Sequence, residues 1–551
     1  MALNLLIPFT LIGLFGMAIA LFRMRNQPKG LYVLFFAEMW ERFSYYGMRA
    51  LLVFYLTKHF LFTDDAAYGI YGAYTTLVYI MPVIGGVLAD RYLGQRRAVT
   101  IGAILLVLGH LGMAIEGEPV QPGGTADGTI LNIFYLSLAL IVMGVGFLKA
   151  NISTIVGELY AKTDPRRDGA FTLFYVGINL GAFLGAIWAG YLGEVHGWKY
   201  GFGLAGVGML LGLIVFVLGK PLLKGAGEAR DETLLNAKRF MGLSTKWMIY
   251  LGTLIVTLLV WLVVRDQAVV GVILALTGAI VVGYVLYRAV FTLEPHARDR
   301  IFAALILIST QVLFWALFEQ AGSSLNIYAD EQVDRTLFGA EIPASVFQSL
   351  NAFYIIFLGP IFAATWVFLA NRNLEPTAPQ KFGLGVIQLG LGFLVLVWGA
   401  GGADALTPVL FLFLIYLLHT TGELCLSPVG LSAMTRLSVP SMVGLIMGTW
   451  FLASGAGNFV AALIAQATGS GRIEGADALD PVAQKALVID VYQTVGWVAV
   501  AVGGGLLVVA PLINRLMHLS TLTDDELPGL HAHQAEIPVD ETPQGGTTRP
   551  V

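Results

Sequence analysis

Long apolar segments alternate with short polar, charged segments along the whole chain. A helix needs about 20 mostly apolar residues to cross the hydrocarbon core of a bilayer. Fifteen segments meet this requirement, near residues 4–22, 31–57, 67–89, 98–115, 130–155, 169–193, 199–218, 247–264, 268–290, 301–328, 344–370, 381–400, 406–435, 441–467 and 490–514. The pattern predicts an all-α integral membrane protein with fourteen core spans, the second to the fifteenth, and an extra N-terminal helix.

The segment 4–22 has two other interpretations. Ala18-Ile19-Ala20 resembles a signal-peptide cleavage site, but no basic residues precede the apolar run. Alternatively, the start codon is placed too early and Met24 is the true start. We favour an uncleaved helix with its N-terminus outside, because cleavage would leave the basic residues that follow the segment outside as well.

Basic residues are distributed unequally between alternate loops. One set of loops carries 22 Lys and Arg residues, beginning with Arg23 and ending with Arg515, whereas the other set carries six, including Lys58 and Arg335. Lys and Arg are retained on the cytoplasmic side of membrane proteins. The first set and the C-terminus are therefore predicted to be cytoplasmic, and the strict alternation supports the number of spans.

The core spans divide into two halves of six, joined by a basic linker near 219–246, as in a duplicated transporter. The pair of spans at 247–290 is then an inserted hairpin. The predicted regions are an extra helix and basic linker at 1–28, a six-helix bundle at 29–218, a linker with the hairpin at 219–300, a second six-helix bundle at 301–516 and a disordered cytoplasmic tail at 517–551.

The composition agrees with a membrane protein. Hydrophobic residues make up 57% of the chain and charged residues 12%, about half the charged fraction of an average soluble domain. An ordinary soluble protein is therefore excluded. The single cysteine, Cys425, has no partner in the chain, so there is no disulfide framework.

Seven ionisable residues lie within the predicted spans, where an Arg, Lys or Asp costs about 2.5–3.5 kcal/mol at a helix centre. They are Glu38, Glu41, Arg42, Arg49, Lys149, Glu319 and Glu423. When all are ionised, four acids and three bases sum to −1, so one mobile proton would neutralise the excess. This arithmetic favours a proton-coupled carrier.

Polar residues of the second segment fall on one helix face. At about 100° per residue this stripe consists of Glu38, Glu41, Arg42, Tyr45, Tyr46 and Arg49. Such a face must meet another helix or a water-filled cavity rather than lipid. A structural ion-pair network is one interpretation, but arginines and tyrosines beside two glutamates suit the capture of a ligand better.

The other three charges stand on other segments. Lys149 either extends toward the membrane surface or needs a buried counter-ion, for which we expect Glu41. Glu319 follows Trp315 by one helical turn, and Glu423 precedes Ser427 by one turn. Burial disfavours an ionised carboxylate and a neighbouring arginine favours it, so these acids can change protonation as helices move.

A metal site is not predicted. His419 and Glu423 have the i, i+4 spacing of metal ligands, but no further His or Cys lies nearby. A polar packing contact explains the pair more simply.

Several motifs resemble those of one transporter family. The run Glu38-Met39-Trp40-Glu41-Arg42-Phe43-Ser44-Tyr45-Tyr46 resembles the E-x-x-E-R-F-x-Y-Y signature of the proton-coupled oligopeptide transporter family, within the major facilitator superfamily. Residues 85–97, 171–185 and 422–428 resemble three further motifs of that family. The similarity runs from about 29 to 516, and the hairpin at 247–290 resembles the extra helix pair of bacterial members.

The resemblance implies a major facilitator fold and a symporter that imports di- and tripeptides with protons across a bacterial inner membrane. Arg42, Arg49 and Lys149 would bind the carboxylate of the peptide, and Glu423 would bind its ammonium group. Tyr45, Tyr46, Tyr79, Asn179, Trp315, Asn351, Ser427 and Trp450 would line the pocket. From the residues themselves, the aromatic members of this set could equally be core side chains.

For coupling, we expect ionised Glu319 to pair with Arg49 and protonated Glu319 to release it. Glu38 and Glu41 would take part through Arg42 and Lys149. The expected partners are short peptides, protons and membrane lipid, with no nucleic acid, and the expected state is a monomer. No cofactor is expected besides the proton gradient as driving force.

Three other functions are compatible with a many-span membrane protein. A family relative could carry nitrate or another small anion, but an acid at Glu319 argues against this. A proton-antiport drug exporter is the second alternative. An intramembrane enzyme is the third, but only His110 and His419 lie in spans, without a nucleophile triad, so the protein is expected not to be an enzyme.

Overall fold

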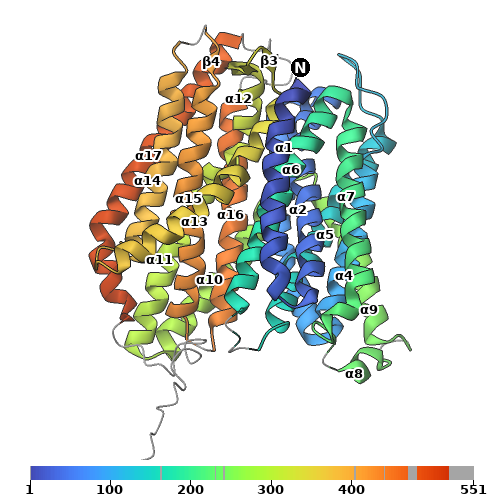
Figure 1. Ribbon diagram of the computed structural model, residues 1–551, viewed down its shortest axis with the longest axis vertical. Coiled ribbons are helices and arrows are strands. Elements are labelled where there is room, and N and C mark those ends of the chain that lie inside the picture. The colour runs from blue at the N-terminus through green and yellow to red at the C-terminus, as the bar shows by residue number, and fades with distance from the viewer. Residues whose placement is uncertain are drawn as a thin grey trace, which may run out of the picture.

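Long helices run side by side from one end of the molecule to the other (Figure 1). The computed structural model describes residues 2–161, 164, 166–229, 231–239, 242–402, 405–439, 441–469 and 481–519. Fourteen helices in these ranges are long and apolar enough to cross a membrane. α2 (Lys29–Phe54) is a further helix of 26 residues, which the charges at its centre keep out of that number. The predicted all-α membrane architecture is confirmed.

The first half of the molecule consists of α2 to α7. α2 packs against α6 and α7, whereas α5 lies between α3 and α4. The extra helix α1 (Ala2–Arg23) packs on the outside of α6. The other elements are η1 (Met24–Asn26), η2 (Tyr55–His59), α3 (Asp64–Leu88), η3 (Ala89–Leu93), α4 (Gln95–Met113), α5 (Gly128–Glu158), α6 (Arg167–His196), α7 (Trp198–Gly219) and η4 (Lys220–Leu223).

The second half consists of the helices from α11 onward. α14 packs between α15 and α17, and α11 packs against α16 and α17. The two halves meet where α16 packs on α3 and where α13 packs on α6. The elements are α11 (Pro295–Phe318), η5 (Glu319–Gly322), α12 (Ser324–Gln332), η6 (Ala344–Gln348), α13 (Ser349–Ala370), α14 (Ala378–Gly399), α15 (Leu410–Leu437), α16 (Val443–Gly469) and α17 (Pro481–Met517).

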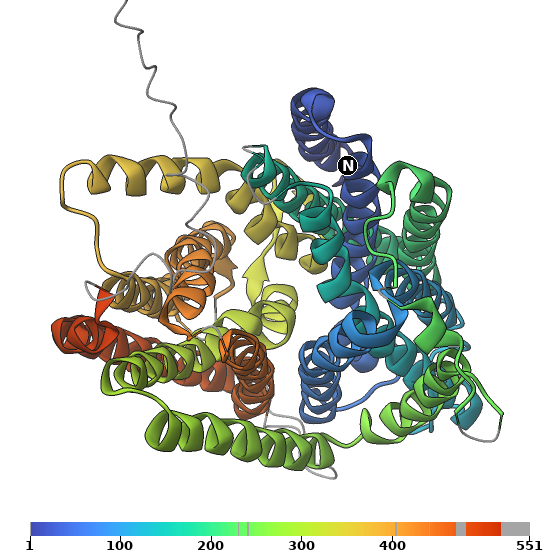
Figure 2. The ribbon, with the colours of Figure 1, turned by 90° about the horizontal axis from the view of Figure 1, so that it is seen from below.

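The hairpin between the halves has two long helices, α9 (Thr245–Val263) and α10 (Gln267–Thr292), and is preceded by the short α8 (Glu232–Asn236). α9 packs against α5 of the first half, whereas α10 packs against both α3 and α16. Seen along the helices, the pair lies at the outer edge of the bundle (Figure 2). The hairpin therefore bridges the two halves on one side.

Four two-residue strands lie at one end of the molecule, which we call the strand end; the opposite end, where α8 lies, is the α8 end (Figure 1). β1 (Val333–Asp334) pairs in parallel with β4 (Thr407–Pro408), and β2 (Thr336–Leu337) pairs antiparallel with β3 (Ala340–Glu341). The apolar pattern gave no sign of these strands, because two residues are too few for a period to show.

Two spans differ from their predicted extent. The segment predicted as one helix at 301–328 is interrupted between α11 and α12 by the 3₁₀ turn η5. The last span was predicted from residue 490 but begins at Pro481, because Lys485 is buried and donates to the backbone oxygens of Ala400 and Gly402, each at 3.0 Å. The predicted tail lies outside the described residues from position 520 onward.

Glycines bring α6 directly onto the backbone of α2. A Cβ atom at Gly181 would lie 2.1 Å from the backbone oxygen of Met39, and one at Gly185 would lie 2.3 Å from that of Phe43. Small residues allow this close approach in membrane proteins, where dispersion contacts rather than the hydrophobic effect hold helices together. The contact fixes the rotation of α2 against α6.

Polar contacts join the two halves at the strand end. Lys58 Nζ lies 2.5 Å from Asp330 Oδ2, and Asn326 Nδ2 donates to the backbone oxygen of Ala50 at 3.1 Å. Each contact connects the end of the α2 span with α12. The two halves are therefore in contact at this end.

Candidate functional site

The charged stripe of α2 begins with one arginine held between two glutamates. Arg42 Nε lies 2.8 Å from Glu38 Oε1 and 3.1 Å from Glu41 Oε2. All three side chains are buried. Two carboxylates thus share one guanidinium inside the membrane-spanning part of the chain.

The carboxylates of this cluster are incompletely satisfied. Glu38 Oε2 and both oxygens of Glu41 are buried without a hydrogen-bond partner among the described residues. A buried ionised group is costly unless it is paired and hydrogen-bonded. The two carboxylates therefore keep oxygen atoms that can accept a proton or a hydrogen bond.

Arg49, the last residue of the stripe, joins the two halves of the molecule. Its Nη2 atom forms an ion pair with Glu319 Oε2, and its Nε atom donates to the hydroxyl of Tyr71 at 2.7 Å. The guanidinium also lies 5.8 Å from the ring centroid of Tyr46. The predicted pair between Arg49 and Glu319 is confirmed, and it connects α2 to η5.

The turn η5 gives Glu319 its position. Glu319 begins the turn and Gly322 ends it, and a Cβ atom at Gly322 would lie 1.9 Å from the Tyr71 hydroxyl oxygen and 3.0 Å from Arg49 Nε. Any other residue at Gly322 would displace these two side chains. The break in the span, with glycine at position 322, therefore leaves space for the side chains of Arg49 and Tyr71.

Lys149 differs from its prediction. Its ammonium lies over the ring of Tyr79, 4.0 Å from the ring centroid. The expected ion pair with Glu41 is wrong: Glu41 pairs with Arg42, its neighbour on the same helix, and no ion pair joins it to Lys149 in the described part of the chain. Lys149 nevertheless lies close enough to Glu38, Glu41 and Glu319 to interact with them electrostatically.

Glu423 is held by residues of two helices. Asn351 Nδ2, from α13, donates to Glu423 Oε2 at 2.8 Å and also to Thr420 Oγ1 at 3.1 Å. Glu423 itself is half-buried on α15, as is Ser427 one turn further on. One oxygen of the carboxylate is thus fixed by an amide while the group stays partly accessible.

Tyr46 lies among the acidic and basic groups of both halves. It is near enough to Arg42, Arg49, Glu319 and Glu423 to interact electrostatically with all four. Its ring packs edge-on against that of Tyr45, at a centroid distance of 5.3 Å. The structure therefore brings the α2 stripe and the acids of the second half into one site.

The remaining predicted residues surround this site or lie beside it. Asn179 Nδ2 donates to the backbone oxygen of Tyr175 on its own helix, at 3.0 Å. Trp315 packs edge-on against Phe318, and its buried Nε1 atom has no hydrogen-bond partner among the described residues. Trp315 is thus a donor without an acceptor one turn before Glu319.

Trp450 occupies a packing position. It is buried, it contacts Phe382 edge-on, and a Cβ atom at Gly430 would lie 2.0 Å from its ring. It therefore fills the space between α14, α15 and α16. Nothing in these contacts points its ring toward the charged cluster.

Tyr71 was not predicted as a site residue. Its side chain is uncharged, but its hydroxyl accepts a hydrogen bond from Arg49. Tyr74 follows it by three residues, is buried, and has a hydroxyl with no hydrogen-bond partner within the described ranges. The signal was present as tyrosines spaced three residues apart in an otherwise apolar span, at Tyr68, Tyr71 and Tyr74.

In the described ranges no group of three or more His, Cys, Asp or Glu side chains is placed to hold a metal ion. His419 instead packs against the ring of Phe393, with a centroid distance of 4.9 Å.

A sequence model of the POT family matches residues 96–479. The chain belongs to the POT family. It is 36% identical over 461 residues to the peptide transporter YePEPT of Yersinia enterocolitica, covering 80% of this chain and 88% of that protein. It is 31% identical over 493 residues to dipeptide and tripeptide permease A of Edwardsiella piscicida, and the match covers 89% of this chain and 96% of that protein.

Among solved structures, a mutant peptide transporter POT in complex with alafosfalin superposes on the fold with a TM-score of 0.75. That chain is 36% identical, and the match covers 90% of this chain and 96% of the other. The match is therefore too extensive to be confined to one half of the chain.

Proposed function

We propose that this POT family member is a proton-coupled symporter that imports di- and tripeptides by alternating access. The observation that carries the proposal is the ion pair between Arg49 and Glu319, which ties the two halves together inside the membrane and beside a second acid, Glu423. The relatives named as peptide transporters and as di- and tripeptide permeases support the same substrate class.

The two ends of a peptide fit the two kinds of charge in the site. The basic groups Arg42, Arg49 and Lys149 come from the first half and suit the C-terminal carboxylate. Glu423 comes from the second half, is held by Asn351 at 2.8 Å, and suits the N-terminal ammonium. A peptide that spans the two would draw the halves together, and its length would be limited by the distance between them.

Coupling follows from competition for Arg49. Glu319 and the peptide carboxylate both need the same guanidinium, and a carboxylate that gains a proton gives up most of its attraction to it. Protonation of Glu319 therefore frees Arg49 for the substrate and loosens the contact between α2 and η5. Release of peptide and proton on the other side restores the pair.

The proton gradient sets the direction of transport, and the membrane orientation sets which end of the molecule faces outside. We infer that the α8 end and the C-terminus face the cytoplasm of a bacterium and that the strand end lies outside its inner membrane, because loops rich in Lys and Arg stay on the cytoplasmic side. The protein works as a monomer and uses no cofactor; the proton gradient supplies the driving force.

Uptake into vesicles tests the proposal. Purified protein in proteoliposomes should accumulate labelled dialanine and trialanine above the external concentration when the outside is acidic, and unlabelled dialanine but not nitrate should compete. Tight vesicles that accumulate neither peptide, or uptake that nitrate blocks, would contradict peptide transport and favour the anion carrier.

The Gly322→Ala variant should transport dialanine about tenfold more slowly or worse than the wild type. Overpacking a well-packed interior costs about 1–3 kcal/mol, and here the added methyl group meets the two side chains that hold Glu319 in place. Initial uptake rates at equal protein content measure the effect. Gly448→Ala is the matched control, because a Cβ atom there meets no atom within 4 Å. Equal rates for the two variants would show that transport does not depend on the space that Gly322 leaves for Tyr71 and Arg49.

A further inference from the structure

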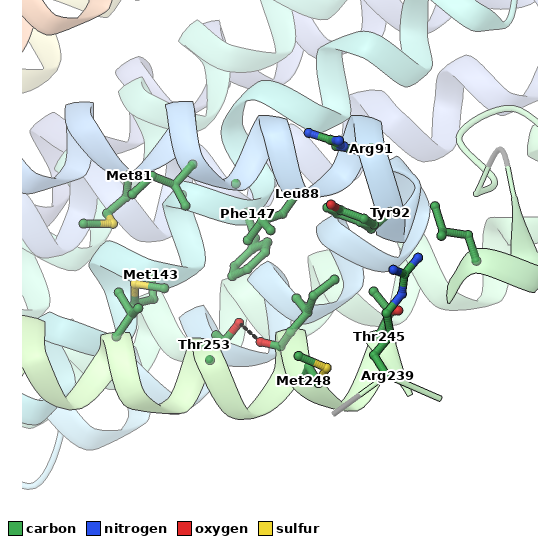
Figure 3. Close-up of a pocket in the computed structure, with 17 residues that line it drawn as sticks. Met81, Leu88, Arg91, Tyr92, Met143, Phe147, Arg239, Thr245, Met248 and Thr253 are labelled. Atoms are coloured by element: carbon green, nitrogen blue, oxygen red, sulfur yellow. Dashed lines mark hydrogen bonds between the residues drawn. The ribbon is translucent and has the colours of Figure 1, made fainter. Parts of the chain in front are cut away.

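A groove separate from the transport site lies beneath the first helix of the hairpin (Figure 3). Its volume is about 590 Å³, which is within the range of pockets that bind small molecules, and it is walled by α3 with η3, by α5 and by α9. None of the predicted transport residues lines it. The hairpin therefore encloses a space whose purpose the transport mechanism leaves open.

The groove has a polar end and an apolar end. Arg91, Tyr92, Thr245 and Arg239 lie together at one end, whereas Met81 and Met143 lie at the other, as Figure 3 shows. The lining between the two ends is mostly apolar and includes Leu88 and Phe147. The hydroxyl of Thr253, which also lies there, donates to the backbone oxygen of Ile249 on its own helix at 2.8 Å. A ligand that fills it must have an anionic or polar head and a long apolar tail.

The two guanidiniums at the polar end are not neutralised by acids. Arg91 is exposed and lies over the ring of Tyr92 at 5.6 Å, and neither Arg91 nor Arg239 forms an ion pair among the described residues. The nearby acids pair elsewhere, since Glu228 and Glu232 each lie 2.7 Å from Arg96 and Arg97 respectively. Thr245 adds a buried hydroxyl without a hydrogen-bond partner in the described ranges.

The groove lies at the depth where a lipid head group would reach it. Trp247 is 55% exposed in the first turn of α9, and exposed tryptophans mark the boundary between membrane and water. Further along α9, Leu254, Leu258 and Leu262 are about half exposed, at 57%, 45% and 54%, so this helix borders the acyl chains. The polar end therefore meets the membrane surface and the apolar end points into the bilayer.

We propose that this groove binds one anionic phospholipid of the cytoplasmic leaflet. Its phosphate lies between Arg91 and Arg239, and one acyl chain runs along Leu88 and Phe147 toward Met81. Basic pockets between membrane helices on the cytoplasmic side suit such head groups, at about 1 kcal/mol for each Lys or Arg. The bound lipid fills the space under α9 and fixes the hairpin on the first half. The orientation is taken from the proposed function, but the binding itself does not depend on transport.

Native mass spectrometry of the full-length protein with added lipids tests the head group. The wild type should retain phosphatidylglycerol and lose phosphatidylcholine at equal concentration. The double variant Arg91→Gln with Arg239→Gln should bind phosphatidylglycerol about tenfold more weakly or worse. The control is Arg288→Gln with Arg372→Gln. These two arginines form no ion pair within the part of the chain that the structure describes: Arg288 donates to Thr292 and Tyr284, and Arg372 lies over Phe368.

A second pair of variants tests the apolar part of the groove and serves if the arginine variant does not fold. Gly252→Leu puts a side chain into the groove, where a Cβ atom meets nothing within 4 Å, and should abolish retention of phosphatidylglycerol. Gly278→Leu, at an equally open position on α10, should leave it unchanged. The proposal is overturned if Gly252→Leu retains lipid like Gly278→Leu, or if phosphatidylcholine is retained as well as phosphatidylglycerol. Because lipid is counted directly, failure of peptide transport would leave this result unaffected.

Discussion

The Glu319→Gln variant should lose proton-driven accumulation of peptide but keep counterflow exchange. Glutamine has nearly the same shape but cannot bind and release a proton, and it leaves Arg49 permanently without its ionised partner. Peptide can then still exchange for peptide across the membrane, because that cycle needs no change in protonation. The ratio of internal to external dialanine under an inward proton gradient should fall from well above one to about one.

A matched control separates this effect from the general loss of an ion pair. Glu375 forms a 2.5 Å pair with Lys381 at the start of α14, outside the charged site, and Glu375→Gln should accumulate dialanine like the wild type. If Glu319→Gln still accumulated peptide against its gradient, Glu319 would not be the coupling acid. If counterflow disappeared together with accumulation, the residue would be needed for binding rather than for coupling.

The Glu423→Gln variant should lose its preference for peptides with a free N-terminus. A hydrogen bond to a charged group contributes about 1.5–3 kcal/mol. The affinity of the variant for dialanine should therefore be lower than that of the wild type by about tenfold or more. N-acetyl-dialanine has no ammonium group, and its weak binding should hardly change. Competition of the two compounds against labelled dialanine gives the ratio of their affinities.

The ratio is the deciding quantity for Glu423, because a misfolded site would lower both affinities together. Asn351 holds the carboxylate at 2.8 Å and can hold the amide of a glutamine in the same place, so the site should keep its shape. An unchanged ratio in Glu423→Gln would mean that the ammonium group is bound elsewhere.

The sequence predicted the helices and much of the site because both depend on local spacing. Apolar runs of membrane length located every span, and the charges of α2 share a face because a helix repeats every 3.6 residues. The pairing of Arg49 with Glu319 was a hypothesis about proton coupling, and the structure contains the pair. The resemblance to the oligopeptide transporters is confirmed by the match to the POT family.

Other features that depend on tertiary contacts were not predicted. Arg42 engages Glu41 because it is the next residue on the same helix, and Lys149 is left over Tyr79. The break at η5 depends on Gly322, whose importance is visible only when Tyr71 stands against it. In sequence, a single glycine within an apolar span carries no such information.

The groove under α9 also depends on tertiary contacts that the sequence does not predict. Arg91 and Arg239 are far apart in sequence, and each reads as one of many cytoplasmic cations. Only the packing of α9 on α5 brings them to one end of an apolar groove.

The most direct test of symport is the proton movement that peptide itself causes. Proteoliposomes containing a trapped pH dye, at equal pH inside and outside and with membrane potential clamped by potassium and valinomycin, should acidify inside when dialanine is added outside. Glu319→Gln vesicles should not. Acidification in the wild type is the result that a peptide and proton symporter requires. An unchanged internal pH despite peptide entry, or internal alkalinisation as an antiporter would give, would contradict the proposed function.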